Sequence, residues 1–284
     1  MKMHRWSSLR ATQFLLLCAY LVVVVYPLLW LLYSSLKTDQ AIFQNPFALP
    51  AFDALQWVNY ARAWTEARIS RYFWNSLLVT SGSVAGCLLL ASMAAYALSR
   101  FRIRGGTAIF LLFLCGLMIP MQLSIIPLFF QMRDWGLLNS RLGLMLVYMA
   151  GGLPFAIFIL AGFFRTLPGT LYEAAVIDGC SEWRVFWNIM LPLARPGMVT
   201  VAIFLFLGTW NEYFTAFMFL SGADSEAART LPLGLANIAI VSQYRSDYGV
   251  SFAGLVLVLL PTLLFFVILQ KRIVKGIAAG ALKG

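Results

Sequence analysis

The sequence predicts an all-α membrane protein with six transmembrane helices. Of its 284 residues, 61% are hydrophobic and 11% are charged, a composition too apolar for a soluble globule. Apolar runs long enough to cross the ~30 Å hydrocarbon core recur along the chain. The expected spans are 11–36, 73–99, 106–131, 142–164, 197–221 and 249–270.

The first of these runs needs to be distinguished from a secretory signal. It follows Lys2, Arg5 and Arg10, as the apolar region of a signal would. It is too long for that region, and no small-x-small cleavage site ends it, so we expect a permanent span bent at Pro27. In the later runs Pro120, Pro127, Pro154 and Pro261 indicate kinks of the kind that helix bundles tolerate.

Basic residues predict the orientation of the spans. With both termini in the cytoplasm, the inner loops and ends hold the larger share of the 21 lysines and arginines. The net charge of +10 is then explained by topology, and we expect no nucleic-acid partner.

Catalysis is not expected of this chain. Its one histidine, His4, lies at the N-terminus, and the four cysteines are scattered without a C-x-x-C pair, so no triad or metal cluster is predicted. The phosphate-binding pattern G-x-x-x-x-G-K-[ST] does not occur. We therefore expect no catalytic residue, no bound metal and no cofactor held by this chain.

The segment between the fourth and fifth expected spans has a different character. Leu171–Pro196 carries acids and arginines and cannot lie in hydrocarbon, yet Tyr172, Ala175 and Val176 repeat at helical spacing. A second set at the same spacing comprises Trp183, Phe186, Trp187 and Met190. The pattern predicts two short amphipathic helices that turn at Asp178–Gly179 and end at Pro192. A capping box from Thr170 to Glu173 and a left-handed Gly179 are also expected.

The same segment, "EAAVIDGCSEWRVFWNIMLPLARP", resembles the EAA motif of ABC-importer permeases: E-A-A, three residues, G, then about nine residues to apolar-x-L-P. The stretches "NSLLVTSGSVAGCLLLASMAAYALSRF", "WNEYFTAFMFL" and "KRIVKGIAAGALKG" are similar to other parts of those proteins, in the same order. Cys180, where alanine is usual, is a mild departure. The whole chain resembles the inner-membrane permease of maltose-type carbohydrate importers.

The resemblance implies a single permease domain over residues 1–284 in a bacterial or archaeal cytoplasmic (inner) membrane. Its cytoplasmic loop 168–196 would couple to an ATPase, and its C-terminal tail would reach that ATPase. The implied coupling residues are Glu173, Ala174, Ala175, Asp178, Gly179 and Pro192. The implied tail residues are Lys275, Gly276, Gly280 and Lys283. For Trp183, Phe186 and Trp187 we favour packing against the chain's own helix ends.

The resemblance also implies a function and a set of partners. The chain would move a sugar into the cytoplasm by alternating access, beside a second homologous permease in a heterodimer, two ATP-binding subunits, an extracytoplasmic sugar-binding protein and membrane lipid. ATP and magnesium would be bound by the ATPase. A secondary transporter or channel without an ATPase remains an alternative, as does an ABC permease for a non-sugar solute.

Two further segments have functional interpretations. Trp210, Asn211, Glu212 and Tyr213 combine rings and hydrogen-bonding groups, which indicates either a part of the solute pathway or a structural post between helices. The first outer loop, "ALQWVNYARAWTEARISRYFWNS", predicts a surface helix that serves as a platform for a binding protein or as an interfacial aromatic belt.

Overall fold

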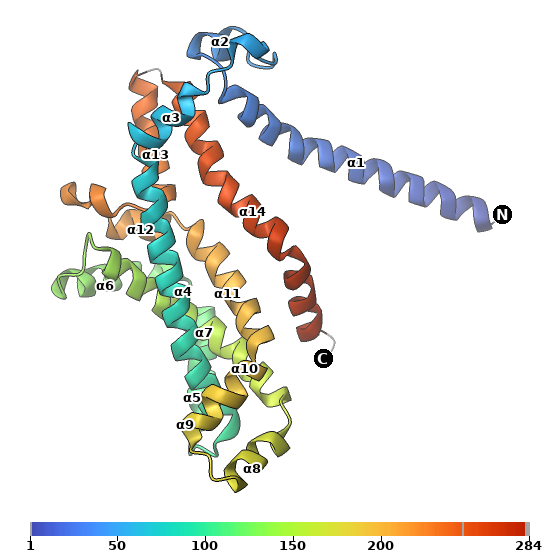
Figure 1. Ribbon diagram of the computed structural model, residues 1–284, viewed down its shortest axis with the longest axis vertical. Coiled ribbons are helices and arrows are strands. Elements are labelled where there is room, and N and C mark those ends of the chain that lie inside the picture. Colours follow the sequence, from blue (N-terminus) through green and yellow to red (C-terminus); the bar gives the residue numbers. More distant parts are fainter. Residues whose placement is uncertain (1, 246, 282–284) are drawn as a thin grey trace. The chain divides into compact units, whose positions relative to one another are not determined.

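The chain is helical throughout the part that the structure describes. This computed structural model describes residues 2–245 and 247–281, with the side chains of 10–222, 225–238, 240, 247–268 and 270. No strand occurs among these residues. The chain forms two compact units, Met1–Ser70 with Gly234–Pro261 and Arg71–Leu233 with Thr262–Gly284. Figure 1 shows the order of the helices along the chain.

Within the described residues, four helices are long and apolar enough to cross a membrane. They lie in α1 (Lys2–Ser34), α4 (Ile69–Arg100), α7 (Arg141–Thr166) and α14 (Tyr248–Ala281). Two bent helix pairs pass the same test of composition, so the number of spans is four to six. The expected class of a helical, multi-pass membrane protein is confirmed at this level.

The expected third span is not one straight helix. It consists of α5 (Gly106–Met118) and α6 (Met121–Asp134), which meet at 101°. Ile119 and Pro120 between them have extended backbones. The residue before a proline is disfavoured in the helical conformation, and the proline has no N–H to continue the ladder, so the helix stops there.

The fifth expected span is also divided. α11 (Arg195–Trp210) ends before Asn211, and the short helix α12 (Phe214–Phe219) follows after two residues more. At its other end α11 meets the helical segment Glu182–Leu193 at 72°. A 3₁₀ turn (Ala223–Ala228) and α13 (Leu231–Arg245) complete the path to α14.

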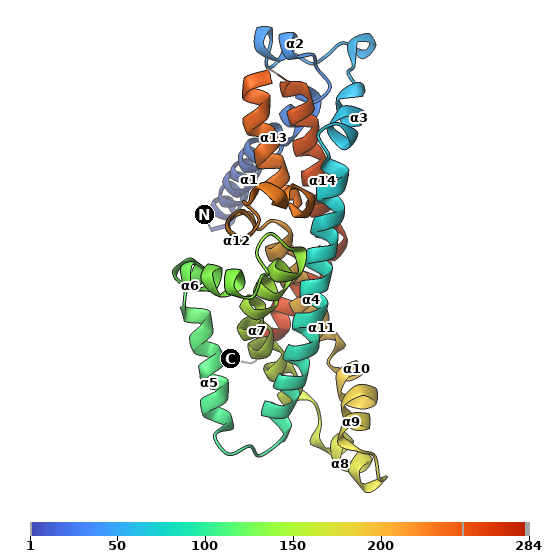
Figure 2. The ribbon, with the colours of Figure 1, turned by 90° about the vertical axis from the view of Figure 1, so that its left-hand side faces the viewer.

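The unit that contains α4 to α12 has two apolar cores. α7 contacts both α5 and α11, and α12 packs on α6 and α7, as the two ribbon views allow the reader to follow (Figures 1 and 2). One core includes Ala91, Leu160 and Phe164, and the other includes Val79, Leu144 and Phe219. All of these residues except Phe219, which lies in the short helix α12, come from the long helices α4 and α7, so the two cores join these helices to each other.

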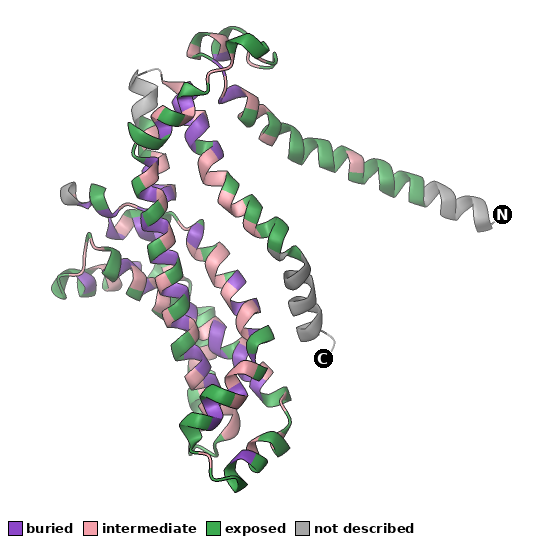
Figure 3. Ribbon diagram, viewed as in Figure 1, coloured by how far each residue is buried: buried purple, intermediate pink, exposed green. Residues whose placement is uncertain are grey.

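The other unit begins with α1 and continues through short helices. The apolar side chains of α1 from Phe14 to Tyr26 are exposed, as the green colouring of Figure 3 shows. Next come α2 (Asp39–Gln44), a 3₁₀ turn (Phe52–Ala54) and α3 (Val58–Thr65). The helix α3 agrees with the surface helix expected in the first outer loop.

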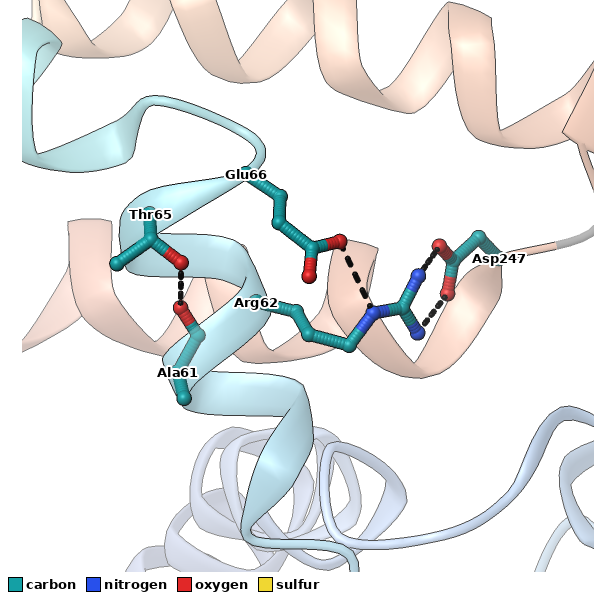
Figure 4. Close-up of polar contacts among 5 residues, drawn as sticks. All are labelled: Ala61, Arg62, Thr65, Glu66 and Asp247. Carbon is teal, nitrogen blue, oxygen red and sulfur yellow. Dashed lines mark hydrogen bonds and ion pairs between the residues drawn. The ribbon is translucent and has the colours of Figure 1, made fainter.

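Polar contacts fix this loop region. Arg62 makes two hydrogen bonds to Asp247, of 3.2 and 2.5 Å, and a third of 3.2 Å to Glu66 (Figure 4). Asp39 accepts the N–H of Gly249 at 2.8 Å. Asp247, directly before α14, is therefore tied to α3, and the first turn of α14 is tied to the start of α2.

Candidate functional site

The segment with the EAA pattern folds as a helix pair, residues 169–193. The first arm of the pair is α8 (Gly169–Ile177). The second arm consists of α9 (Glu182–Val185), a π-helical turn (Phe186–Met190) and α10 (Leu191–Leu193). Between the arms Gly179 has φ of +77°, the left-handed conformation that glycine adopts without strain, as predicted.

Two local predictions for the helix pair were wrong. The capping box does not form, because α8 begins at Gly169 after Pro168, and no side chain caps its first turn. The second arm does not end at Pro192. The N–H of Leu191 donates to the carbonyl of Phe186, five residues earlier, so the turn before Pro192 is wider than an α-turn. The helix therefore continues past Pro192 and ends at Leu193.

The second arm packs into a core of its own chain. Val185, Phe186 and Met190 are buried, and the ring of Phe186 lies 5.2 Å from that of Tyr96 on α4. Phe186 thus packs as expected, but Trp183 and Trp187 remain 61% and 44% exposed. Burial of three large side chains anchors this arm to the end of α4.

The two alanines of the motif have different surroundings. Ala175 is 5% exposed and belongs to the same core as Phe186, whereas Ala174 is exposed. The expectation that both alanines line a surface for a partner does not fit this placement. The exposed residues of α8 and its turn are Thr170, Leu171, Glu173, Ala174, Val176, Ile177, Asp178 and Gly179.

Glu182 connects three elements and was not singled out from the sequence. The Tyr172 hydroxyl on α8 donates to its Oε1 at 2.6 Å, and the Tyr96 hydroxyl on α4 donates to its Oε2 at 3.4 Å. The first of these bonds, more than partial burial, raises the pKa of Tyr172. The only sequence signal for Glu182 was its place as a carboxylate in the first turn of an amphipathic helix. Its partner Tyr96 is too distant in the sequence for a local pattern to predict the contact.

Arg100 secures the neighbouring helix end. Its Nη2 donates to the carbonyls of Phe164 and Leu167, at 3.2 and 2.7 Å, where α7 ends. Carbonyls at a helix C-terminus lack partners within the helix, and a guanidinium suits them by charge as well. Arg100 therefore fixes the end of α7 directly before the helix pair begins.

Glu212 lies at a second candidate site. It accepts a hydrogen bond of 2.6 Å from the Tyr148 hydroxyl and bonds of 2.8 and 3.2 Å from the N–H groups of Thr215 and Ala216. Its carboxylate thus caps α12 and faces a cavity of about 340 Å³. Hydrogen-bonding side chains in the lining include Gln122, Tyr148, Thr209, Glu212 and Thr215; Phe204 and Phe214 add aromatic faces.

The four residues predicted as one polar-aromatic cluster are not brought together. Trp210 is buried between Phe206 and Phe73, with ring centroids 5.5 and 5.7 Å away. Asn211 accepts a 3.3 Å hydrogen bond from Thr262, and Tyr213 stacks on Phe217. The helix break at 211–213 turns successive side chains in different directions, so only Glu212 of the four lines the cavity.

The predicted tail is described in part. α14 continues to Ala281, so the backbones of Lys275, Gly276 and Gly280 are helical. Lys283 lies outside the described residues, and so do the side chains from 271 onward. Within the described part of the chain, no group of three or more His, Cys, Asp or Glu residues could hold a metal ion.

These observations define a class of protein, a multi-pass helical membrane protein with a helix pair between two of its apolar segments. Comparison with known proteins identifies the family. The profile of the binding-protein-dependent transport system inner membrane component matches residues 87–279, more than half of the chain. The chain belongs to this family, as the resemblance of its motif implied, and it is thus one component of a multi-subunit transport system.

Relatives of known name agree along nearly the whole length. The diacetylchitobiose uptake system permease protein NgcG of Streptomyces coelicolor is 44% identical over 94% of this chain and 87% of its own length. The trehalose transport system permease protein SugB of Mycobacterium tuberculosis is 33% identical over 97% and 98%. A bacterial ABC transporter involved in alginate import shares the fold, with a TM-score of 0.80 at 24% identity over 92% and 94%.

Proposed function

We propose that this chain is a permease subunit of an ATP-driven importer that carries a sugar into the cytoplasm by alternating access. Its partners would be a second homologous permease, two ATP-binding subunits and an extracytoplasmic sugar-binding protein. The observation that carries the proposal is the helix pair 169–193, anchored at one face and exposed at the other. The names of the relatives, permeases for diacetylchitobiose and trehalose, favour a sugar as the solute.

The proposed topology counts α5 with α6 as one span and α11 with α12 as another, so that the helix pair 169–193 lies outside the membrane. Six spans then place both termini and the helix pair in the cytoplasm, in agreement with the distribution of basic residues. Reporter fusions after Arg102 and Glu182 should be cytoplasmic, and fusions after Asp53 and Asn139 should be outside. A reporter at Glu182 that faces outside would contradict the coupling mechanism.

The exposed side of α8 is the proposed contact with the ATP-binding subunit. Ile177 is 85% exposed on a polar loop, and Glu173, Ala174 and Asp178 lie beside it. An exposed apolar residue with charged neighbours is the pattern of a helix that docks into a groove. Ala175 and Pro192 would act indirectly, by seating the helix pair on its own chain. The tail residues Lys275, Gly276, Gly280 and Lys283 are a second proposed contact.

The exposed apolar surface of α1 supports a further permease subunit beside lipid. The exposed apolar stretch of α1 from Phe14 to Tyr26 needs an apolar environment, which lipid and a partner helix both provide. In addition, one helix pair per chain would engage one ATP-binding subunit, so a dimer of these subunits requires two permeases.

The cavity at Glu212 is proposed to lie on the solute pathway. Carboxylate, amide and hydroxyl groups beside aromatic rings suit the hydroxyls and apolar faces of a sugar. Glu212→Gln retains one of the two accepting oxygens and should lower uptake modestly, because one hydrogen bond contributes about 0.5–1.5 kcal/mol. Glu212→Ala loses all three bonds and should lower it more.

The test is solute uptake in proteoliposomes that contain the chain and its co-purifying subunits. ATP should drive uptake of N,N′-diacetylchitobiose, trehalose or another sugar when binding protein is present, and ATP hydrolysis should belong to a partner. Uptake driven by a proton or sodium gradient without ATP would support the secondary-transporter alternative. Passive flux would support a channel, and ATP-driven uptake of other solutes alone would support a non-sugar permease.

A further inference from the structure

A cavity of about 370 Å³ lies beside the helix pair, between the end of α4 and α9. Its lining consists of Met93, Tyr96, Ala97, Phe101, Glu182, Trp183 and Phe186. Four of these residues are aromatic and one is a carboxylate, while none is basic. This composition differs from that of the Glu212 cavity, where amide and hydroxyl groups line the wall.

The cavity has a fixed inner wall and an exposed rim. Tyr96 is buried, with its ring 5.6 Å from Phe101 and 5.2 Å from Phe186. Trp183, which lines the cavity from α9, is 61% exposed, although tryptophan usually covers apolar surface. A side chain that enters from outside would meet the Trp183 ring first.

Among the described side chains, Glu182 forms no ion pair. Both of its described side-chain partners are phenol hydroxyls, and among the described side chains no lysine or arginine lies within 4 Å of its carboxylate. Arg100, at the end of the same helix α4, is bound to the carbonyls of α7 instead. Each carboxylate oxygen retains a lone pair for another donor.

An arginine side chain matches these surroundings. Its guanidinium stacks on aromatic faces and binds a carboxylate, and its three methylenes suit apolar walls such as those of Met93 and Ala97. A lysine would present a compact, strongly hydrated ammonium that is harder to strip of water. A wholly apolar side chain would leave Glu182 without a cation.

We propose that this cavity receives an arginine side chain of the ATP-binding subunit. The inference rests on the proposed function, since it names a second contact of the same docking surface. The contact is reciprocal: α8 enters a groove of the partner, and the partner's arginine enters a cavity of this chain. Glu182 would then join the docked arginine to Tyr172 on α8 and Tyr96 on α4.

The test measures binding of the co-purifying ATP-binding subunit to the chain in nanodiscs. Trp183→Ala and Trp183→Leu should both weaken binding about five- to thirtyfold, whereas Trp183→Phe, which keeps an aromatic face, should stay within about threefold. Trp187→Ala is the matched control, because Trp187 is an exposed tryptophan of the same arm outside the cavity lining. Its binding should equal that of the wild type.

A charge exchange tests the carboxylate. Glu182→Arg should abolish tight binding, and an arginine-to-glutamate change on the ATP-binding subunit should restore it at one position only. Equal binding of Trp183→Leu and wild type would overturn the proposal in favour of an apolar side chain, and equal binding of all variants would show an empty cavity. If even the wild-type chain captured no ATP-binding subunit, the proposed function itself would fail.

Discussion

The loop region after α1, residues 35–66 with the start of α14, and the helix pair 169–193 are held to their long helices by different forces. In the loop region Lys37 donates to the carbonyls of Asn45 and Pro46, and Asn59 donates to those of Ser35 and Lys37. In the helix pair Val185, Phe186 and Met190 supply buried apolar volume. Hydrogen bonds in the loop region depend on the positions of individual polar atoms, whereas packing in the helix pair depends on how much apolar volume is filled.

The two regions should therefore tolerate different kinds of substitution. Directional bonds that are part of a buried network leave unsatisfied groups when one partner is removed. An apolar anchor leaves a cavity instead, and the cost grows with the volume removed. The helix pair should therefore be sensitive to size and the loop region to polarity.

The largest effect is expected in the helix pair. Phe186→Ala removes a buried ring that contacts Tyr96, and we expect the free energy of unfolding to fall by about 3–5 kcal/mol. Trp187→Ala, at a half-exposed neighbour, should cost under about 1 kcal/mol. Thermal unfolding in detergent and proteolysis within 169–193 measure both. Equal losses in the two variants would show that burial does not anchor this arm.

The loop region should respond to loss of one amide. In Asn59→Leu the carbonyls of Ser35 and Lys37 lose donors at 2.9 and 3.0 Å, and we expect a loss of about 1–3 kcal/mol. Gln56→Leu is the control, since Gln56 makes an exposed bond to Ala54. The midpoint of thermal unfolding distinguishes the two variants. If Asn59→Leu were as stable as Gln56→Leu, the polar account of the region would be wrong.

A smaller effect is expected at Arg62. Hydrogen bonding to Asp247 raises the pKa of Arg62, but both side chains are partly exposed and solvent screens the pair. Arg62→Lys loses the two-pronged geometry and should cost about 0.5–1 kcal/mol, less at high salt. A double-mutant cycle with Asp247→Asn measures the coupling. A loss that did not change with ionic strength would point to packing by the arginine stem.

The smallest effect is the alkaline sensitivity of the helix pair. Because the bond to Glu182 raises the pKa of Tyr172, that bond contributes fully below the usual phenol pKa of about 10 and is lost as pH rises through the higher folded value. Proteolysis at the Asp178–Gly179 turn should increase above about pH 10 in the wild type. Tyr172→Phe should show the higher rate already at neutral pH and a flatter profile. Identical profiles would show that the Tyr172 bond does not join α8 to α9.

The features predicted from the sequence are those set by local chemistry. Helical class, the amphipathic pair and the left-handed Gly179 follow from apolar spacing and from the one residue type that accepts positive φ. The 101° bend at Pro120 was expected only as a kink, because a proline stops a helix but packing of α6 decides where the chain turns. Periodicity predicts a break, not its angle.

Most of the contacts at the candidate sites could not be predicted from the sequence, because they join residues that lie far apart in it. Tyr96 and Glu182 are 86 positions apart, and Tyr148 and Glu212 are 64 apart, so no local pattern relates them. Ala174 and Ala175 differ by one position, yet about 100° of helix rotation makes one exposed and the other buried. Which face of α8 turns inward depends on where α4 ends.

The π-helical turn before Pro192 affects the direction in which the side chains after it point around the helix axis. Within Phe186–Met190 the chain holds one more residue per turn than an α-helix, which spares the proline ring a clash with the preceding turn. Pro192→Ala would remove the reason for that extra residue. If the turn tightened to an α-turn, everything after Met190 would rotate by about 100° relative to Glu182, while the helix kept its length in residues. Pro192 thus influences how far α11 is rotated about the helix axis relative to the second arm of the helix pair.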